Sequence, residues 1–97
     1  MKHLKAWGIP ANIPDPEKEP EQAKAAFRFL SAIKGICGFC PHESGNTLIV
    51  FDQIEHARAA KWKLEEFCTV PLAIIEGSLT EDNKTFNCYR VLKGDGN

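Results

Sequence analysis

The stretch TLIVFDQIEHARAAKWKLEEF, residues 47–67, contains the two patterns that decide the fold. Its first five residues form a continuous apolar run, which is typical of a strand covered on both faces. From Asp52 the pattern becomes helical, with one apolar stripe: Ala57, Ala60, Leu64 and Phe67. Asp52 and Glu55 have the spacing of a capping box, so we expect Asp52 to open this helix.

A second helix is expected upstream of that strand, over residues 21–34. Its apolar side chains recur at helical spacing: Ala23, Ala26, Phe27, Leu30 and Ile33. Pro20 suits the first turn, and Gly35 is a natural stop after the last one. Residues 10–20 form a proline-rich acidic loop, because proline removes a backbone donor and restricts the residue before it.

Four further extended segments complete the predicted fold: residues 2–9, 36–42, 72–79 and 85–92. Right-handed crossovers place both helices on one face of the sheet. The expected strand order is 72–79, 2–9, 47–51, 36–42, with 85–92 beside 72–79. The sequence therefore predicts an α+β fold, a ferredoxin-like βαββαβ sandwich with an additional C-terminal antiparallel strand. It forms one domain over residues 1–97, with a flexible tail at 93–97.

Composition and charge exclude several classes of protein. The 97 residues include 12 basic and 13 acidic side chains, for a net charge of −1, so the chain has no overall excess of charge for binding nucleic acid or for mimicking it. No apolar run approaches the roughly 20 residues of a membrane-spanning helix, and the N-terminus does not resemble a signal peptide. We therefore expect a cytoplasmic protein with reduced cysteines and no membrane contact.

The motif Cys37-Gly38-Phe39-Cys40 is the candidate metal site, with His42 as a third zinc ligand and Cys68 or Cys88 as a fourth. In an extended segment Cys37 and Cys40 would point to opposite faces, so chelation requires a bend at Gly38. The alternative is that these thiols fill gaps in a strand. Because the motif follows a helix, its context is the reverse of the one that redox pairs use.

Catalytic signatures are absent from the sequence. The three histidines, His3, His42 and His56, have no nucleophile motif beside them, and no glycine loop cradles a phosphate. His56 lies about 70° from the centre of its helical stripe, which indicates a boundary residue. We expect no enzyme activity and no cofactor other than a possible zinc ion.

The predicted arrangement resembles the RNA-recognition motif, a family that stacks bases on aromatic side chains of its two central strands. The family's third-strand pattern can be laid over residues 44–51, where Gly45 and Phe51 match. Asn46 and Leu48 stand at the positions of the stacking aromatics. On the first strand Lys5 occupies such a position, with Trp7 nearby. The resemblance implies a degenerate nucleic-acid binder in which Trp7 supplies the stacking.

Two tryptophans mark the candidate interaction surfaces. Trp62 projects about 170° away from the buried stripe of its helix. It is flanked by Arg58 and Glu66, and tryptophan beside arginine is typical of an interface. Alternation places Trp7 on the sheet face opposite the helices, together with Lys5 and His3. That face is expected to be open, and residues 48–51 add apolar side chains to it, which favours another protein or a second copy as its partner.

The leading hypothesis is a non-catalytic protein-interaction module that uses the open sheet face or the second helix. Residues 27–30 (FRFL) and 46–51 (NTLIVF) carry a resemblance to the small ferredoxin-like proteins of phages and prophages, without matching one named family. That resemblance implies an inhibitor of a host defence enzyme, similar to an anti-CRISPR protein. The alternatives are the degenerate nucleic-acid binder and a small zinc-stabilised module.

Overall fold

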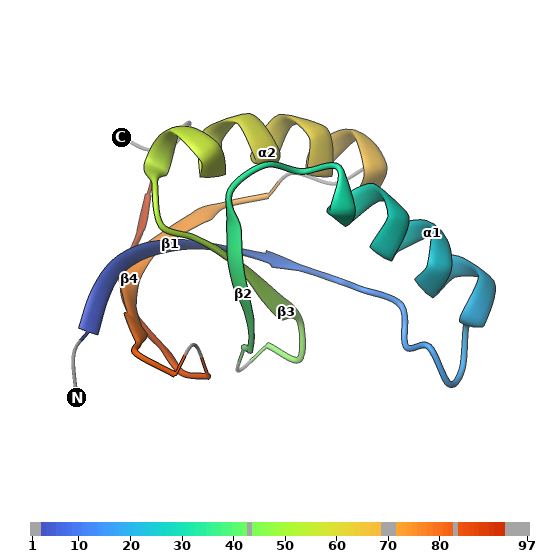
Figure 1. Cartoon of the computed structure of the whole chain (residues 1–97), viewed down its shortest axis with the longest axis horizontal. Helices are drawn as coiled ribbons and strands as arrows, with labels where there is room; N and C mark the ends of the chain where they lie inside the picture. The colour runs from blue at the N-terminus through green and yellow to red at the C-terminus, as the bar shows by residue number, and fades with distance from the viewer. Residues whose placement is uncertain (1–2, 43, 69–71, 83, 93–97) are drawn as a thin grey trace.

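Strand β3 (Thr47–Phe51) lies inside a five-stranded sheet, as its continuous apolar run predicts. The computed structural model describes residues 3–42, 44–68, 72–82 and 84–92, so the predicted tail at 93–97 lies outside the described residues. The sheet is antiparallel, in the order β2-β3-β1-β4-β5, and two helices complete the α+β fold (Figure 1). The other elements are β1 (His3–Ala11), α1 (Pro20–Ser31), β2 (Ile36–Pro41), α2 (Ile54–Cys68), β4 (Ile74–Thr80) and β5 (Phe86–Leu92).

Strand β1 continues two residues beyond the predicted segment and includes Pro10. It pairs with β4 only as far as Gly8, whereas it pairs with β3 up to Ala11. Proline cannot donate to a ladder and is tolerated where a strand has an open edge. Pro10 lies in such a place, because β4 does not pair with β1 beyond Gly8.

Helix α2 buries three of the four residues of its predicted stripe: Ala57, Ala60 and Leu64. It begins at Ile54, later than the capping box indicates. The stripe's last member, Phe67, is exposed and stacks on Phe29 of α1, with ring centroids 4.6 Å apart and planes 15° apart. This contact joins the two helices outside the main core.

One side of the sheet carries both helices and holds a set of buried residues that we call the first core. Its members come from four strands, from both helices and from Ile33 just beyond α1: Ile9, Ala11, Leu30, Ile33, Ile49, Phe51, Ala57, Ala60, Leu64, Ile74 and Leu92. In Figure 1, α2 lies across the sheet and α1 lies beside it, near β2. The two helices therefore share one apolar layer.

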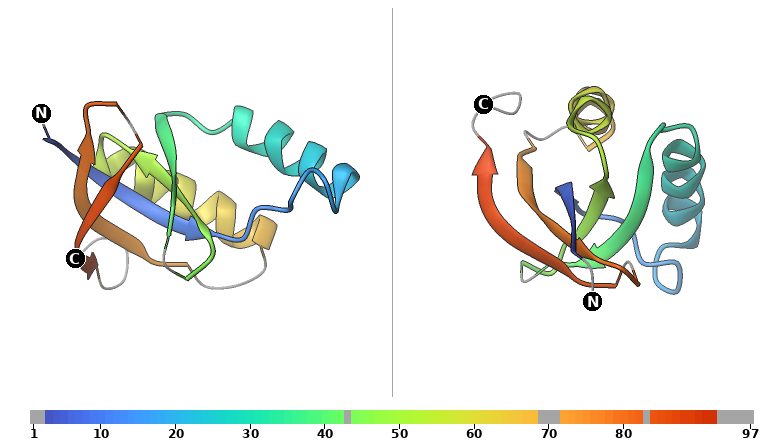
Figure 2. Two further views of the ribbon diagram at one scale, coloured as in Figure 1. Left: turned by 90° about the horizontal axis from the view of Figure 1, so that it is seen from below. Right: turned by 60° about the vertical axis from the view of Figure 1, so that its left-hand side comes forward.

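The opposite side of the sheet, which the sequence analysis expected to be open, is also buried. Its residues form a second core: Ala6, Cys40, Leu48, Val50, Ile75 and Leu79. The sheet is strongly curled (Figure 2), and one hollow on this side is lined both by Pro41 of β2 and by Phe86 of β5. The two edge strands thus approach each other and cover the middle of the sheet, so the expected open docking face is closed there. On the same side Leu4 and Val91, the cross-strand partners of Leu79 and Ile75, stay exposed.

Phe86 packs on the second core over two glycines, and Gly77 is the one whose missing Cβ leaves room for its ring. A Cβ at Gly77 of β4 would lie 2.8 Å from ring atoms of Phe86. A Cβ at Gly8 of β1 would lie 3.6 Å from the same ring and 3.1 Å from Leu48 of β3. Glycine in a strand often marks such a close approach. The ring therefore reaches from the edge strand across two neighbouring strands.

We predict that Gly35→Ala destabilises the fold more than Gly45→Ala. Both glycines have left-handed backbones, with φ of +92° and +91°, which cost another residue about 1–2 kcal/mol. A Cβ at Gly35 would also overlap the imidazole of His56, 2.7 Å from its Cβ, whereas nothing lies within 4 Å at Gly45. The overlap adds about 1–3 kcal/mol to the loss at Gly35.

Urea denaturation measures both losses, and a third variant isolates the overlap. Adding His56→Ala to Gly35→Ala should recover the second part of the loss and leave the backbone part. Equal losses of unfolding free energy in Gly35→Ala and Gly45→Ala would contradict the packing of Gly35 against His56.

Candidate functional site

Cys37 and Cys40 both pack against the second core, whereas strand alternation predicted opposite faces. The cause is a β-bulge, seen as a register shift between Ile36 and Gly38. A bulge adds one residue to one strand of a pair, so the side chains that follow it change face. The bend that chelation requires is therefore present, but it brings the two thiols into an apolar interior.

His42 does not complete a metal site with these cysteines. It lies just beyond β2, and its Nδ1 is 2.7 Å from Oγ of Ser44, a partner within its own turn. Within the described part of the chain, no three His, Cys, Asp or Glu side chains are close enough together to hold a metal ion. Neither Cys68 nor Cys88 therefore joins Cys37, Cys40 and His42 in one metal site.

Burial raises the pKa of three cysteine thiols. For Cys40 the negative charge of Asp82 adds to this effect, and for Cys37 the charge of Asp52 does so. The pKa of Cys68 is raised by burial alone. Because the thiolate is the nucleophile and the metal ligand, a raised pKa makes these cysteines less reactive at neutral pH.

Trp7 packs against the first core, so its predicted place on the face opposite the helices is wrong. Its cross-strand partner, Phe51, is buried in the same core, and partners in a sheet share a face. Ala6 and Gly8, the residues on either side of Trp7 in the strand, face the second core instead. Alternation fixed which residues share a face, but it did not reveal which face the helices cover.

Lys5 and Trp7 form a small cluster with Glu76 and Arg90 of the next strands. In it the two cations are exposed, and Trp7 and Glu76 are partly buried. Nζ of Lys5 lies 5.7 Å from the ring centroid of Trp7 and 3.9 Å from Oε2 of Glu76. Glu76 also accepts a hydrogen bond from Nε of Arg90 at 3.3 Å. Exposed ion pairs of this kind add little stability. The side chain of His3, the third residue expected here, lies outside the described residues.

Trp62 is 63% exposed on α2, in agreement with its predicted outward direction. Glu66, one turn further along, is exposed as well. Arg58 is only partly exposed, and its Nε is shielded from solvent. Nζ of Lys61 lies 6.0 Å from the ring centroid of Trp62. The predicted surface on α2 therefore consists mainly of Trp62 and Glu66.

The base-stacking platform implied by the RNA-recognition resemblance is not exposed. Leu48, at one of the two platform positions of the third strand, belongs to the second core. Trp7, the residue expected to supply the stacking, packs on the helix side. Asn46, at the other platform position, lies in the turn before β3 and lines a hollow at the end of α2. None of these side chains offers a flat aromatic surface opposite the helices.

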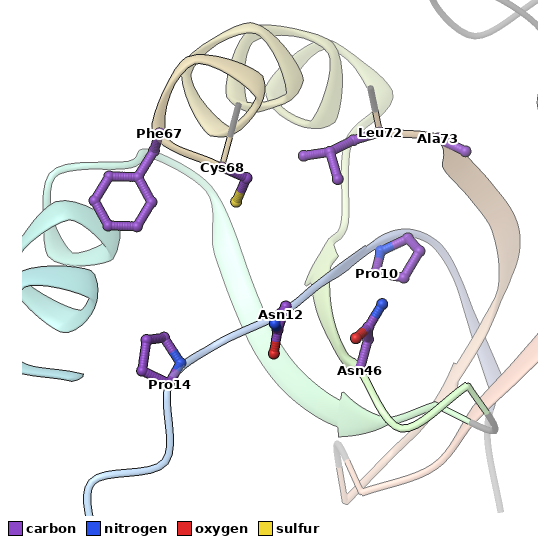
Figure 3. A pocket seen from close by; sticks show the side chains of 8 residues that line it. All are labelled: Pro10, Asn12, Pro14, Asn46, Phe67, Cys68, Leu72 and Ala73. Carbon is purple, nitrogen blue, oxygen red and sulfur yellow. The ribbon is translucent and has the colours of Figure 1, made fainter. Parts of the chain in front are cut away.

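That hollow has a volume of about 550 Å³ and lies where α2 ends (Figure 3). Its wall consists of Pro10, Asn12, Pro14, Asn46, Phe67, Cys68, Leu72 and Ala73. The polar side chains are two amides and one thiol, so no carboxylate, imidazole or amine of the described residues lines it. Residues 69–71, which join Cys68 to Leu72, lie outside the described residues. The titratable side chain among the described residues of this lining is therefore the thiol of Cys68.

A different hollow, of about 340 Å³, lies between α1 and the edge strand β2. We call it the Phe27–Phe39 groove, and its lining residues are Phe27, Leu30, Ser31, Ile33, Ile36 and Phe39. Phe27 on α1 is 47% exposed, and Phe39 on β2 is 45% exposed. Ser31 is the one polar side chain in this lining. The described surface thus has a concave apolar site with an aromatic residue on each wall.

The sequence analysis missed this groove because it placed Phe27 in the buried stripe of α1. Ala23, Ala26 and Leu30 are buried, and Phe29 packs against the first core instead of Phe27. The spacing of the two aromatics was the available signal. Residues two apart on a helix are separated by about 200° of rotation, so Phe27 and Phe29 cannot both face inward.

No family model, no curated protein and no solved structure matches this chain. None of the helices in the described ranges is long and apolar enough to cross a membrane.

We predict that the stability of the fold decreases as the pH rises above 9.0, the ordinary thiol pKa, in part through Cys40. The folded state raises the pKa of this thiol, so it binds the proton more tightly than the unfolded state does. Stability from this source is present below the unfolded pKa and is lost as the pH rises through the folded one.

Urea denaturation between about pH 8 and pH 10 measures this slope. Cys40→Ala should make the slope shallower than that of the wild type. Cys88→Ala, which changes an exposed thiol, should keep a slope steeper than that of Cys40→Ala. Identical slopes for the two variants would contradict the assigned role of Cys40.

We predict that the two tryptophans differ in their access to solvent. In Trp62→Phe only Trp7 fluoresces, and packing against the first core should protect it from acrylamide. In Trp7→Phe only the exposed Trp62 fluoresces, and its Stern–Volmer constant should be several-fold larger. Equal quenching constants would argue that Trp7 lies on an open face after all.

Proposed function

We propose that this chain is a non-catalytic protein-interaction module that binds a segment of another protein in the Phe27–Phe39 groove. The observation that carries the proposal is the pair of half-exposed phenylalanines on opposite walls of an apolar hollow. Exposed apolar patches with polar surroundings often mark protein interaction sites. An apolar side chain that enters the groove would be desolvated between two aromatic rings, as the anchor residues of interfaces are.

The non-catalytic part of the proposal is supported by the chemistry of two hollows, while two others are lined by an imidazole, that of His42 in one and that of His56 in the other. The Phe27–Phe39 groove offers one hydroxyl, that of Ser31, which donates to the carbonyl oxygen of Arg28. The hollow at the end of α2 offers amides and Cys68, whose raised pKa disfavours the reactive thiolate. General acid–base catalysis uses a positioned group that titrates near the working pH. The described residues bring no such group into either hollow.

Trp62 is the competing docking site, since it is more exposed than either Phe27 or Phe39. It lies on the surface of α2, whereas Phe27 and Phe39 share a hollow. Singly exposed apolar residues are normal on protein surfaces. We therefore assign docking to the groove and use Trp62 as the comparison site.

Two finer assignments belong to this proposal. A ferredoxin-like fold is supported by the order β4-β1-β3-β2 of the first four strands, with β5 added at the edge. A phage-type inhibitor of a host defence enzyme is supported by a docking surface without reactive groups, because such an inhibitor acts by occupying its target. Inhibition of a purified defence nuclease that Phe27→Ala and Phe39→Ala abolish would support this role, and unchanged nuclease activity with every nuclease tried would contradict it.

We predict that a protein partner is lost when the groove is changed. Affinity capture would compare the wild type with the double variant Phe27→Ala, Phe39→Ala and with Trp62→Ala. A specific partner should be recovered by the wild type and by Trp62→Ala, and at least about tenfold less by the groove variant, because anchor residues dominate binding energy.

Circular dichroism and urea denaturation would first establish that the variants fold. Equal recovery of every captured protein by all three chains would contradict docking in the groove. Loss of the partner with Trp62→Ala alone would move the docking site to α2.

A further inference from the structure

We infer that the occupant of the Phe27–Phe39 groove is an acidic amphipathic helix of the partner. This inference rests on the proposed function and deepens it by naming the chemistry of the partner. It combines three observations: the apolar lining of the groove, the unpaired basic side chains around it, and the blunted edge of β2.

Three basic residues lie close in sequence to residues that line the groove. Lys24 lies one turn before Phe27 on α1, and Arg28 directly follows Phe27. Lys34 directly follows Ile33 and lines a neighbouring hollow with His56 and Lys63. All three are exposed, and none of them takes part in an ion pair among the described residues. The lining contains no carboxylate. A binding segment with acidic side chains beside its apolar face would therefore gain charge complementarity and a faster association rate.

The edge of β2 is poorly suited to the addition of a strand. The N–H of His42 donates to the carbonyl oxygen of Asn46 at 3.0 Å, which marks a hydrogen-bonded pair of the hairpin. Because such pairs alternate, Cys40 also bonds to β3, and the backbones of Phe39 and Pro41 point outward. Pro41 has no N–H to offer, and the bulge distorts the strand before Gly38. A strand in the groove would therefore find few donors.

A helix matches the dimensions of the groove better. Helix α1 has 12 residues, and at about 1.5 Å per residue it is roughly 18 Å long. Side chains at i, i+4 and i+7 of a bound helix span about 10 Å, so they fit within that length and can contact Phe27, Leu30 and Phe39 from one face. Helix-in-groove binding uses such anchors and needs no backbone hydrogen bonds from the receptor.

Two other occupants agree less well with the charges. In a symmetric dimer the same patch meets itself, so the basic side chains of the two copies would be brought together. A single-stranded nucleic acid would be attracted by Lys24, Arg28 and Lys34 and could stack bases on Phe27 and Phe39, but the chain as a whole has a net charge of −1. Both occupants are outcomes of the following experiment.

The test uses a designed fluorescent peptide of about 16 residues, with leucines on one helical face and glutamates on the other. One control peptide replaces the glutamates by lysines, and a second distributes the leucines around the helix. Fluorescence anisotropy with the full chain at about 50 mM and about 300 mM salt measures binding. We expect the acidic amphipathic peptide to bind at least about tenfold more tightly than either control.

Charge-reversal variants separate the inference from simple apolar stickiness. The double variant Lys24→Glu, Lys34→Glu should weaken binding about tenfold at low salt and less at high salt. The matched control Lys18→Glu, Lys84→Glu has the same net charge but lies away from the groove, and it should bind as the wild type does. These four lysines are exposed, so the result does not depend on a buried substitution. Phe39→Ala tests the apolar wall of the groove and should weaken binding of the peptide at least about tenfold. Trp62→Ala should leave binding unchanged.

Equal binding of the glutamate and lysine peptides would overturn the inference, as would equal losses in the two charge-reversal pairs. A concentration-dependent dimer that Phe39→Ala dissociates would identify a second copy as the occupant and would also overturn it. Tight binding of a single-stranded oligonucleotide that displaces the peptide would do the same. Capture of the partner that is abolished by Phe39→Ala but unchanged by Lys24→Glu, Lys34→Glu would support docking in the groove. The same result would overturn the inference that the occupant is an acidic helix.

Discussion

The ring of Phe86 lies over two positions, Gly77 and Gly8, at which neighbouring strands carry no side chain. This contact joins the edge strand β5 to the middle of the sheet. It depends on Gly77, because a Cβ there would overlap the backbone oxygen of Asn87 and would lie 2.8 Å from the ring of Phe86. The curl that results brings β5 near the end of β2 and buries the second side of the sheet. Strand β3 is consequently enclosed on both faces, between the first core and the second.

The closed second side determines where function can lie. A sheet with one open face would present its central strands to a partner, but here Leu48 and Val50 are interior residues, and so is Cys40 of the cysteine pair. Of the large apolar side chains that stay exposed among the described residues, three are on the helices, three are on the edge strands β2 and β5, and Leu4 is near the start of β1. Of these, Phe27 and Phe39 share a concave site, which is why the proposed docking surface lies at the α1–β2 edge and not on the sheet.

The sequence was sufficient to predict the elements but not the faces they turn to one another. Periodicity identified both helices and the bounds of β3, because those patterns arise from local geometry. The direction of Cys40 depended on a bulge at Cys37, and the direction of Trp7 depended on which side the helices cover. The second core requires Phe86 to reach β1, a contact between residues far apart in the chain. The Phe27–Phe39 groove was missed for a similar reason, since its walls come from different elements.

The closed second side can be tested directly at two neighbouring residues of β3 that face different cores. Leu48 is 1% exposed in the second core, and Ile49 is 0% exposed in the first. Urea denaturation of Leu48→Ala and Ile49→Ala compares them in one strand. We expect both substitutions to lower the free energy of unfolding by about 2–5 kcal/mol, as truncations in a packed core do. A loss within about 0.5 kcal/mol for Leu48→Ala, as at an exposed site, together with a large loss for Ile49→Ala, would show that the second side is open and would contradict this account.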